Sequence, residues 1–140
     1  MTELQWRPPI PADIPLLAAM NQQLIRAEGH RNPMTLAQLE ERMAGFLAGA
    51  YEAAIFVAER PAGYALWRPE PDHVYLRQFF IAPKYRRRGF GRQAIALLRQ
   101  DAWPGQTRLR LEVLVGNESG IAFWRSIGLE PYCLTMEMAL

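Results

Sequence analysis

Four arginines and two glycines gather in one short stretch of the sequence, directly before a segment with the periodicity of a helix. The N–H groups in the first turn of a helix have no intrahelical partners and lie at the positive end of the helix dipole, so they can hold a phosphate. Glycine lets phosphate oxygens approach the backbone, and clustered arginines concentrate positive potential. The stretch therefore predicts a binding site for a pyrophosphate. Its residues are Arg86, Arg87, Arg88, Gly89, Phe90, Gly91 and Arg92.

The segments on both sides of this stretch predict a strand and a helix. Residues 74–81 are rich in β-branched and aromatic residues, as strands are, and apolar residues recur at helical spacing over 93–99. A helix over 89–103 and a strand over 108–115 would complete a βαβ unit, which requires a parallel pair of strands. A helix over 117–127 and a strand over 131–138 would follow.

The first half of the chain predicts two helices and a meander of antiparallel strands. We expect a strand over 3–7, a helix over 13–28, and a second helix that begins with the capping-box spacing of Thr35 and Gln38. Strands over 53–59 and 63–67 lie close enough to form a hairpin around a turn at 60–62. The predicted fold is one α/β domain over 1–140, with helices flanking a mixed, mostly antiparallel sheet that contains a parallel pair.

Composition and charge narrow the class of protein. A chain of 140 residues with 50% hydrophobic and 21% charged residues predicts one globular domain. Because the net charge is only +2, we expect no nucleic-acid partner. We also expect no membrane partner and a cytoplasmic location, since neither a signal peptide nor a span of about 20 apolar residues is apparent. The single cysteine, Cys133, excludes an intrachain disulfide and predicts plain packing in the final strand, while His30 and His73 are too far apart in sequence to suggest a metal site.

The ordered set of motifs resembles the GNAT superfamily of N-acyltransferases. Residues 86–91, Arg-Arg-Arg-Gly-Phe-Gly, look like that family's coenzyme A signature, and Ile81-Ala82-Pro83 resembles the ending of its fourth strand. Leu111-Glu112-Val113 looks like its fifth strand, and the opening at 6–14 is also similar. The final helix of the family is matched at Asn117, Ala122, Phe123, Gly128 and Leu129. The resemblance therefore covers nearly the whole chain.

This resemblance implies acetyl-CoA as co-substrate and a primary amine, of a small molecule or a protein, as acceptor. In the family, strands four and five splay apart at a bulge, and the acyl-pantetheine arm pairs with the free edge like an added strand. Arg86 would shape the loop, and Arg87, Arg88 and Arg92 would reach the phosphates. The resemblance further implies that the arm contacts Phe79, Phe80, Ile81, Asn117, Phe123 and Trp124, although Asn117 could also cap the final helix.

Glu112 is the first candidate for the general base, because an alkylamine with a pKa near ~10 must lose a proton before it attacks a thioester. A structural ion pair with one of the arginines is the other interpretation of this residue. The main-chain amides of Phe80 or Ile81 would hold the oxyanion. The tyrosine with which the family protonates the leaving thiolate is replaced by Trp124, whose indole cannot act as an acid, so Tyr132, Tyr75 or water would take that role.

Three alternatives and one question of assembly stay open. A coenzyme-binding regulatory domain without turnover would keep the same loop. The sequence from Gly89 to Ala94 also satisfies a dinucleotide-binding fingerprint, although residues 83–88 separate it from the preceding strand. Nucleic-acid binding through the arginine run is the third alternative. The apolar final strand could pair with a second copy, which predicts a homodimer. Acidic residues in the first half weakly favour a cationic acceptor.

Overall fold

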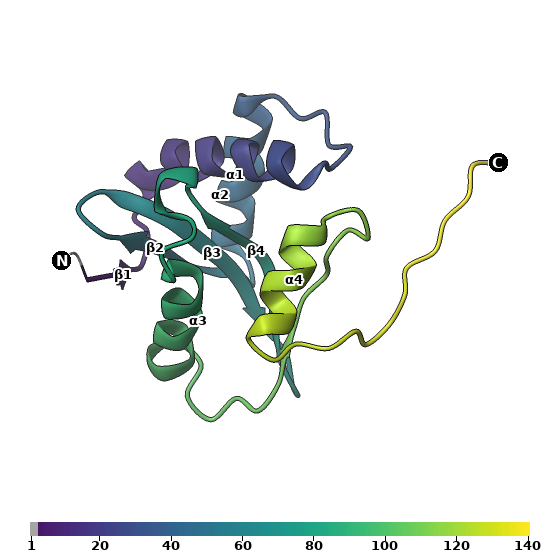
Figure 1. The fold of residues 1–140 in the computed structure, drawn as a ribbon. Helices are drawn as coiled ribbons and strands as arrows, with labels where there is room; N and C mark the ends of the chain where they lie inside the picture. Colours follow the sequence, from purple (N-terminus) through teal and green to yellow (C-terminus); the bar gives the residue numbers. More distant parts are fainter. Residues whose placement is uncertain (1–2) are drawn as a thin grey trace.

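The computed structural model describes residues 3–140 as helices flanking one five-stranded sheet (Figure 1). The strand order is β1-β2-β3-β4-β5, and every neighbouring pair is antiparallel except the parallel pair β4–β5. This is the mixed, mostly antiparallel α/β fold that the sequence predicts. The strands are β1 (Gln5–Arg7), β2 (Glu52–Val57), β3 (Pro61–Pro69), β4 (Val74–Ile81) and β5 (Leu109–Arg110), and the α-helices are α1 (Ile14–Glu28), α2 (Leu36–Ala48), α3 (Phe90–Asp101) and α4 (Glu118–Ser126).

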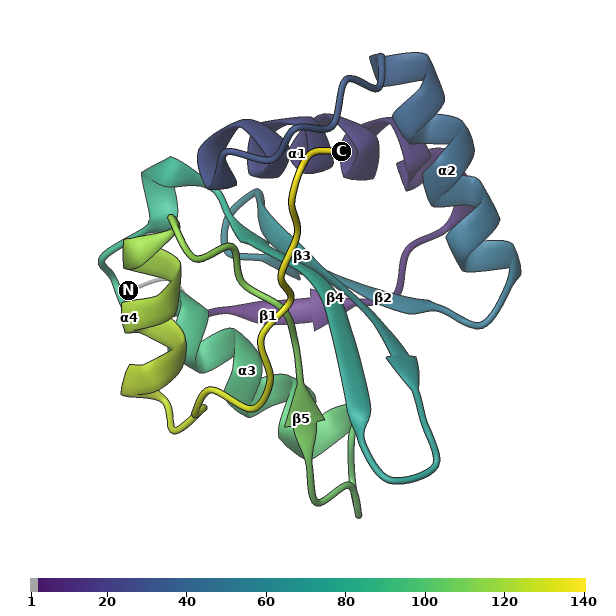
Figure 2. The ribbon, with the colours of Figure 1, turned by 90° about the vertical axis from the view of Figure 1, so that its right-hand side faces the viewer.

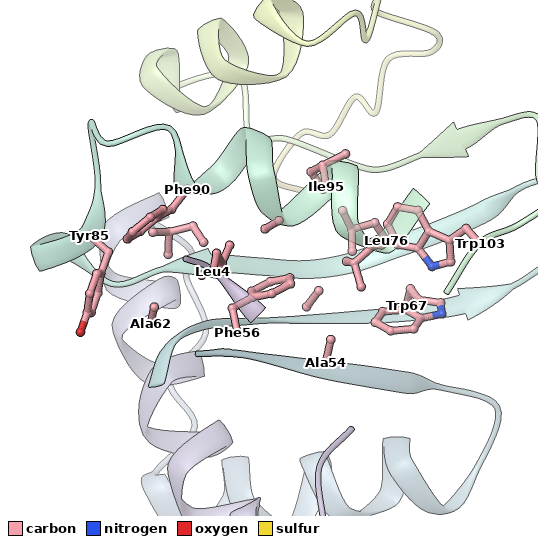
Figure 3. Close-up of a cluster of buried hydrophobic side chains, with 14 of the residues drawn as sticks. Leu4, Ala54, Phe56, Ala62, Trp67, Leu76, Tyr85, Phe90, Ile95 and Trp103 are labelled. Atoms are coloured by element: carbon pink, nitrogen blue, oxygen red, sulfur yellow. The ribbon is translucent and has the colours of Figure 1, made fainter. Parts of the chain in front are cut away.

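The sheet separates two hydrophobic cores because alternate residues of each strand face opposite sides. In β2, Ile55 packs with Leu17 of α1 and Met43 of α2, whereas its neighbour Phe56 packs on the other side with Phe90 of α3. Figure 2 shows α1 and α2 on one face of the sheet and α3 on the other. Figure 3 shows the core beneath α3, where buried aromatic rings such as those of Trp67 and Trp103 meet edge to face.

The ends of the first two α-helices follow local sequence signals. Helix α1 ends at Gly29, which adopts a left-handed φ of 74° that suits glycine. Before α2, Thr35 Oγ1 accepts a hydrogen bond from the Gln38 backbone, and Gln38 Oε1 accepts one from the Thr35 backbone. The capping box predicted from those two residues is therefore confirmed.

Strand β4 has a bulge close to the point where its pairing with β5 ends. Leu66 pairs with Gln78 and Trp67 pairs with Leu76, so Arg77 is the extra residue in β4. On its other side β4 pairs with β5 only through Val74 and Tyr75. Among the described residues no strand pairs with that edge from Leu76 to Ile81. The sheet therefore has the parallel splayed pair that the family resemblance implies.

Three expectations about local structure are wrong. The strand expected over 108–115 is reduced to Leu109–Arg110, because the pairing with β4 ends at Tyr75 and a strand needs a paired neighbour. The hairpin turn lies at 58–60, since β3 already begins at Pro61. Residues 131–138 form no strand, and Cys133 is exposed instead of packed.

The end of the chain is an extended segment that projects from the domain in Figure 1, and its Glu137 forms an ion pair with Arg31, which follows α1. Its alternating apolar residues have the pattern of a half-buried strand, but a strand also needs a neighbour for its backbone hydrogen bonds. The segment has the apolar alternation of a strand, but no strand of the described residues pairs with it. The exposed apolar side chains of this segment are Tyr132, Leu134, Met136, Met138 and Leu140.

Candidate active site

The loop that joins β4 to α3 is closed by Arg86. The chain leaves β4, makes a short 3-10 helix over Pro83–Tyr85, and reaches the arginine run. Arg86 Nε donates a 2.7 Å hydrogen bond back to the carbonyl oxygen of Ile81, and its guanidinium lies 5.6 Å from the centre of the Phe80 ring. Arg86 therefore holds the loop against the end of β4.

The loop presents an open helix terminus. Arg87 is the only non-glycine among the described residues with a positive φ, at 60°, and Gly89 follows with a φ of 76°. The first hydrogen bond of α3 runs from the Gln93 backbone to the Gly89 carbonyl. No side chain of the described residues caps this end of α3. The N–H groups ahead of Gln93 are therefore available to an anion.

The arginines at this terminus are not equivalent. Arg88 lies over the ring of the buried Phe90 at 5.1 Å, which holds its charge close to the helix terminus. Arg92 Nη2 donates a 3.0 Å hydrogen bond to the Ser126 carbonyl and so joins α3 to the end of α4. Arg87 is exposed at the left-handed turn. The structure thus leaves Arg87 and Arg88 free for a ligand, with Arg92 already engaged.

Gly91 serves the packing of α3 against α4. A Cβ at this position would lie 2.9 Å from Cε1 and Cζ of Phe123. The Phe123 ring stacks on Phe79 of β4 with ring centres 6.1 Å apart, and Trp124 meets Phe79 edge to face at 5.3 Å. These three rings form a wall between the open part of β4 and α4.

Asn117 caps α4. Its Oδ1 accepts a 3.1 Å hydrogen bond from the Gly120 backbone. A Cβ at Gly120 would lie 2.4 Å from Asn117 Nδ2, so the absence of a side chain at Gly120 lets the cap fold over it. The capping role considered for Asn117 is therefore present.

A cavity of about 260 Å³ lies where the open edge of β4 meets α1, α2 and the residues after β5. Glu112 is one of its lining residues, and Glu112 Oε1 accepts a 2.8 Å hydrogen bond from the Tyr75 hydroxyl. Burial, followed by this hydrogen bond, raises the pKa of Tyr75 to about 12. Tyr75 therefore stays protonated at neutral pH and fixes one oxygen of the Glu112 carboxylate. Trp124 and Phe79 line the same cavity.

Tyr132 does not line this cavity. Its side chain is 73% exposed on the C-terminal segment, and its ring lies 4.7 Å from the guanidinium of Arg110. The structure thus brings Glu112 together with Tyr75 and leaves Tyr132 outside. Within the part of the chain that the structure describes, no group of three or more metal-binding side chains occurs, and no helix is long and apolar enough to cross a bilayer.

Sequence reasoning missed two arginines in the cavity wall, Arg42 of α2 and Arg77 at the bulge. One signal was available for Arg77, because it is the only charged residue in the strand 74–81. Arg42 gave no such signal, since a charged residue on an amphipathic helix normally faces water. A larger cavity of about 690 Å³, near Trp6 and Ile10, has a mostly apolar wall in which Glu52 is the only charged side chain.

Comparison with known proteins gives the family. Residues 1–129 match the acetyltransferase (GNAT) family. The chain therefore belongs to the GNAT acetyltransferase family.

Individual relatives are more distant. An uncharacterised protein of Mycobacterium leprae is 30% identical over 126 residues, which are 86% of this chain but 33% of that protein. The chain thus spans about a third of the length of this curated relative. Among solved structures, the aminoglycoside N-acetyltransferase AAC(6')-Iy in complex with CoA has a TM-score of 0.78 at 15% identity, covering 100% of this chain and 96% of that one. A possible acetyltransferase from Clostridium difficile has a TM-score of 0.75 at 14% identity, covering 98% and 97%. At these identities the two structures show the shared fold alone.

Proposed function

We propose that this protein transfers an acetyl group from acetyl-CoA to a primary amine, by direct attack in a ternary complex. The observation that carries the proposal is the position of the open terminus of α3, with Arg87 and Arg88 beside it, at the end of the unpaired edge of β4. That edge leads to the cavity that contains Glu112. The exposed thiol of Cys133 suits a reducing compartment, which supports action in the cytoplasm.

The coenzyme would extend from the open terminus of α3, along the unpaired edge of β4, to the cavity. Its diphosphate accepts hydrogen bonds from the first N–H groups of α3 and is attracted by the positive charges of Arg87 and Arg88. Its pantetheine arm runs beside residues 76–81, where its amide groups pair with the free edge of β4. The wall of Phe79, Phe123 and Trp124 packs against the arm. The thioester then reaches the cavity.

Glu112 removes the proton that an alkylamine with a pKa near ~10 carries at neutral pH. The neutral amine attacks the thioester carbon, and a main-chain N–H of Phe80 or Ile81 stabilises the oxyanion. The carbon–sulfur bond then breaks, the amine nitrogen gives its second proton to a water molecule, and the thiolate takes up a proton from water. Glu112 releases its own proton to the solvent, so the net reaction yields one proton. Trp124 cannot supply that proton, and Tyr75 holds its own too tightly, but a thiolate whose conjugate acid has a pKa of ~8.5 can leave unassisted.

The experiment is a thiol-release assay with acetyl-CoA and a panel of primary amines, combined with calorimetric titration of coenzyme A. We expect amine-dependent release of free thiol and formation of the N-acetyl product. Binding of coenzyme A without thiol release for any amine would favour the non-catalytic regulatory domain instead. If coenzyme A does not bind, both proposals fail.

We also propose that the C-terminal segment over 131–140 forms a strand with a second copy of the chain. Its apolar side chains are exposed at fractions such as 86% for Met136, and Val115 after β5 is 83% exposed. Light scattering should give the mass of a dimer, and replacing Leu134 and Met136 by lysine should yield a monomer. The matched control is the same replacement, by lysine, at Thr135, whose side chain points to the opposite side of an extended chain. A monomer mass for the unchanged protein would overturn the proposal.

A further inference from the structure

Two arginines in the wall of the Glu112 cavity have no carboxylate partner. Arg42 Nη2 donates a 3.1 Å hydrogen bond to Asn21 Oδ1, and Arg42 Nε is buried with no hydrogen-bond partner. The hydrogen bond of Arg77 is a long one among the described residues, 3.4 Å from Nη1 to the Tyr51 hydroxyl oxygen. Among the described residues neither arginine takes part in an ion pair. A buried N–H without an acceptor is costly, so the site has capacity for an anion.

The two arginines are held side by side by one aromatic ring. The guanidinium carbon of Arg42 lies 5.4 Å from the centre of the Phe46 ring, and that of Arg77 lies 4.9 Å from it. Burial, and then the neighbouring Arg77, lowers the pKa of Arg42. An anionic group between them would relieve this repulsion and accept bidentate hydrogen bonds, for which guanidinium groups are shaped.

The arginine pair contrasts with its neighbour Arg68. Arg68 lies 5.2 Å from the centre of the Tyr51 ring, within the same group of aromatic rings. Its charge is already compensated, because Arg68 Nε donates a 2.5 Å hydrogen bond to Glu70. Within this group of aromatic rings, Arg68 therefore has a carboxylate partner, whereas the two arginines that line the cavity have none among the ion pairs of the described residues.

The acidic residues of the cavity lie on other elements. Glu112 follows β5 and is bonded to Tyr75, while Glu28 at the end of α1 lies 3.2 Å from His30 Nε2. One cavity thus offers a carboxylate to an amine and two uncompensated guanidinium groups to an anion. Its volume of about 260 Å³ is below the range typical of drug-sized ligands.

We infer that the acceptor is a small amine that also bears an anionic oxygen group, with the amine at Glu112 and the anionic group between Arg42 and Arg77. A free amino acid has this chemistry, and so does an aminoalkyl phosphate. The inference rests on the proposed function. It adds an anionic group to the cationic acceptor that the acidic residues of the first half weakly favour.

Pairs of acceptors that differ only in the anionic group test this inference. Thiol release is measured with amino acids and with their amides, which keep the amine and lose the charge, and with 2-aminoethyl phosphate and ethanolamine. We expect kcat/KM to be about 10- to 100-fold higher for the anionic member of each pair. A preference shared by both pairs identifies an anion site in general, and a preference confined to amino acids identifies a carboxylate site. Equal rates within both pairs would overturn the inference and leave the proposed function intact.

Variants locate the effect. Arg77→Gln and Arg42→Gln should each remove most of the preference, through a higher KM for the anionic acceptor at unchanged KM for acetyl-CoA. Arg68→Gln is the matched control and should keep the preference. Because Arg77 is the more exposed of the pair, its variant gives a folded protein even if the Arg42 variant does not fold. A preference that survives Arg77→Gln would overturn the assignment.

Calorimetry separates the two proposals when no turnover is found. Amino acids and their amides are titrated into protein saturated with coenzyme A. Binding of the acids alone, without turnover, would support the anion site and count against the transferase reaction. Equal binding or no binding of both members would count against the anion site.

Discussion

The hydroxyl of Tyr75 on β4 donates a 2.8 Å hydrogen bond to the carboxylate of Glu112, beyond the end of β5. The bond spans the two strands at the point where their pairing ends, since Tyr75 is the last residue of β4 that pairs with β5. The candidate base is therefore positioned by the same strand that would bind the coenzyme. An ion pair with an arginine, the other interpretation of Glu112, is not among the ion pairs of the described residues.

Replacing Glu112 by Gln should lower kcat/KM about 100-fold, because the amide cannot accept the proton of the amine. Tyr75→Phe keeps the carboxylate but removes its positioning bond, so a smaller loss of about 3- to 10-fold is expected. Both are measured by thiol release across the pH range, with coenzyme A affinity as the control. Full activity of Glu112→Gln at every pH would remove Glu112 from the mechanism.

Arg88→Ala should raise the Kd for coenzyme A by about 10-fold, because a charge-assisted contact at the terminus of α3 is lost. The difference from the unchanged protein should shrink as salt is added. Arg99→Ala is the matched control, since Arg99 is exposed in the last turn of the same helix. Calorimetry measures both, and equal affinities for the two variants would contradict the proposed diphosphate site.

Gly91→Ala should destabilise the protein by about 1–3 kcal/mol, because the new Cβ would overlap the ring of Phe123. The added change Phe123→Leu removes the two ring atoms concerned and should recover part of the loss. Gly45→Ala is the control, since a Cβ at this position in α2 meets nothing within 4 Å. That control should gain about 0.5–1 kcal/mol from helix propensity. Denaturant unfolding gives all three values, and equal stability of the two alanine variants would refute the packing role.

Asp13 should make stability depend on pH in the acid range. Hydrogen bonds from Arg7, and then from the Ile10 backbone, lower the pKa of Asp13 from 3.8 to about 2. Because the pKa of Asp13 is lower in the folded protein than in the unfolded chain, the carboxylate stabilises the fold fully at a pH above the unfolded pKa. This stabilisation is lost as pH falls from about 4 to about 2. Asp13→Asn should therefore cost about 1–2 kcal/mol at pH 7, after allowance for the solvent around Arg7. The difference in free energy of unfolding between the unchanged protein and this variant should narrow toward pH 2 in denaturant titrations. A difference that does not depend on pH would argue against the ion pair.

Local patterns predicted most of the fold. The β-branched and aromatic residues over 74–81 and the helical spacing of apolar residues over 93–99 predicted β4 and α3 within a few residues of their observed bounds. The C-terminal segment shows the limit of this reasoning. Its alternation predicts a strand, but whether a strand forms depends on a neighbour elsewhere in the chain or in another chain.

The candidate site was predicted only in part. Glu112 and the loop before α3 belong to short motifs, so they could be named from the sequence. The partner of Glu112 and the pairing of Arg42 with Arg77 on one ring depend on contacts between distant segments. Such contacts leave no local periodicity, and only the folded chain shows them.

The unpaired edge of β4 has a thermodynamic consequence. A ligand whose own amide groups complete that edge acts as a temporary sixth strand, so it contributes to the folding free energy of the protein. At a concentration of 100 times its Kd, such a ligand would add about 2.7 kcal/mol. The supply of the ligand in the cell would then set how much of this protein survives heat and proteolysis.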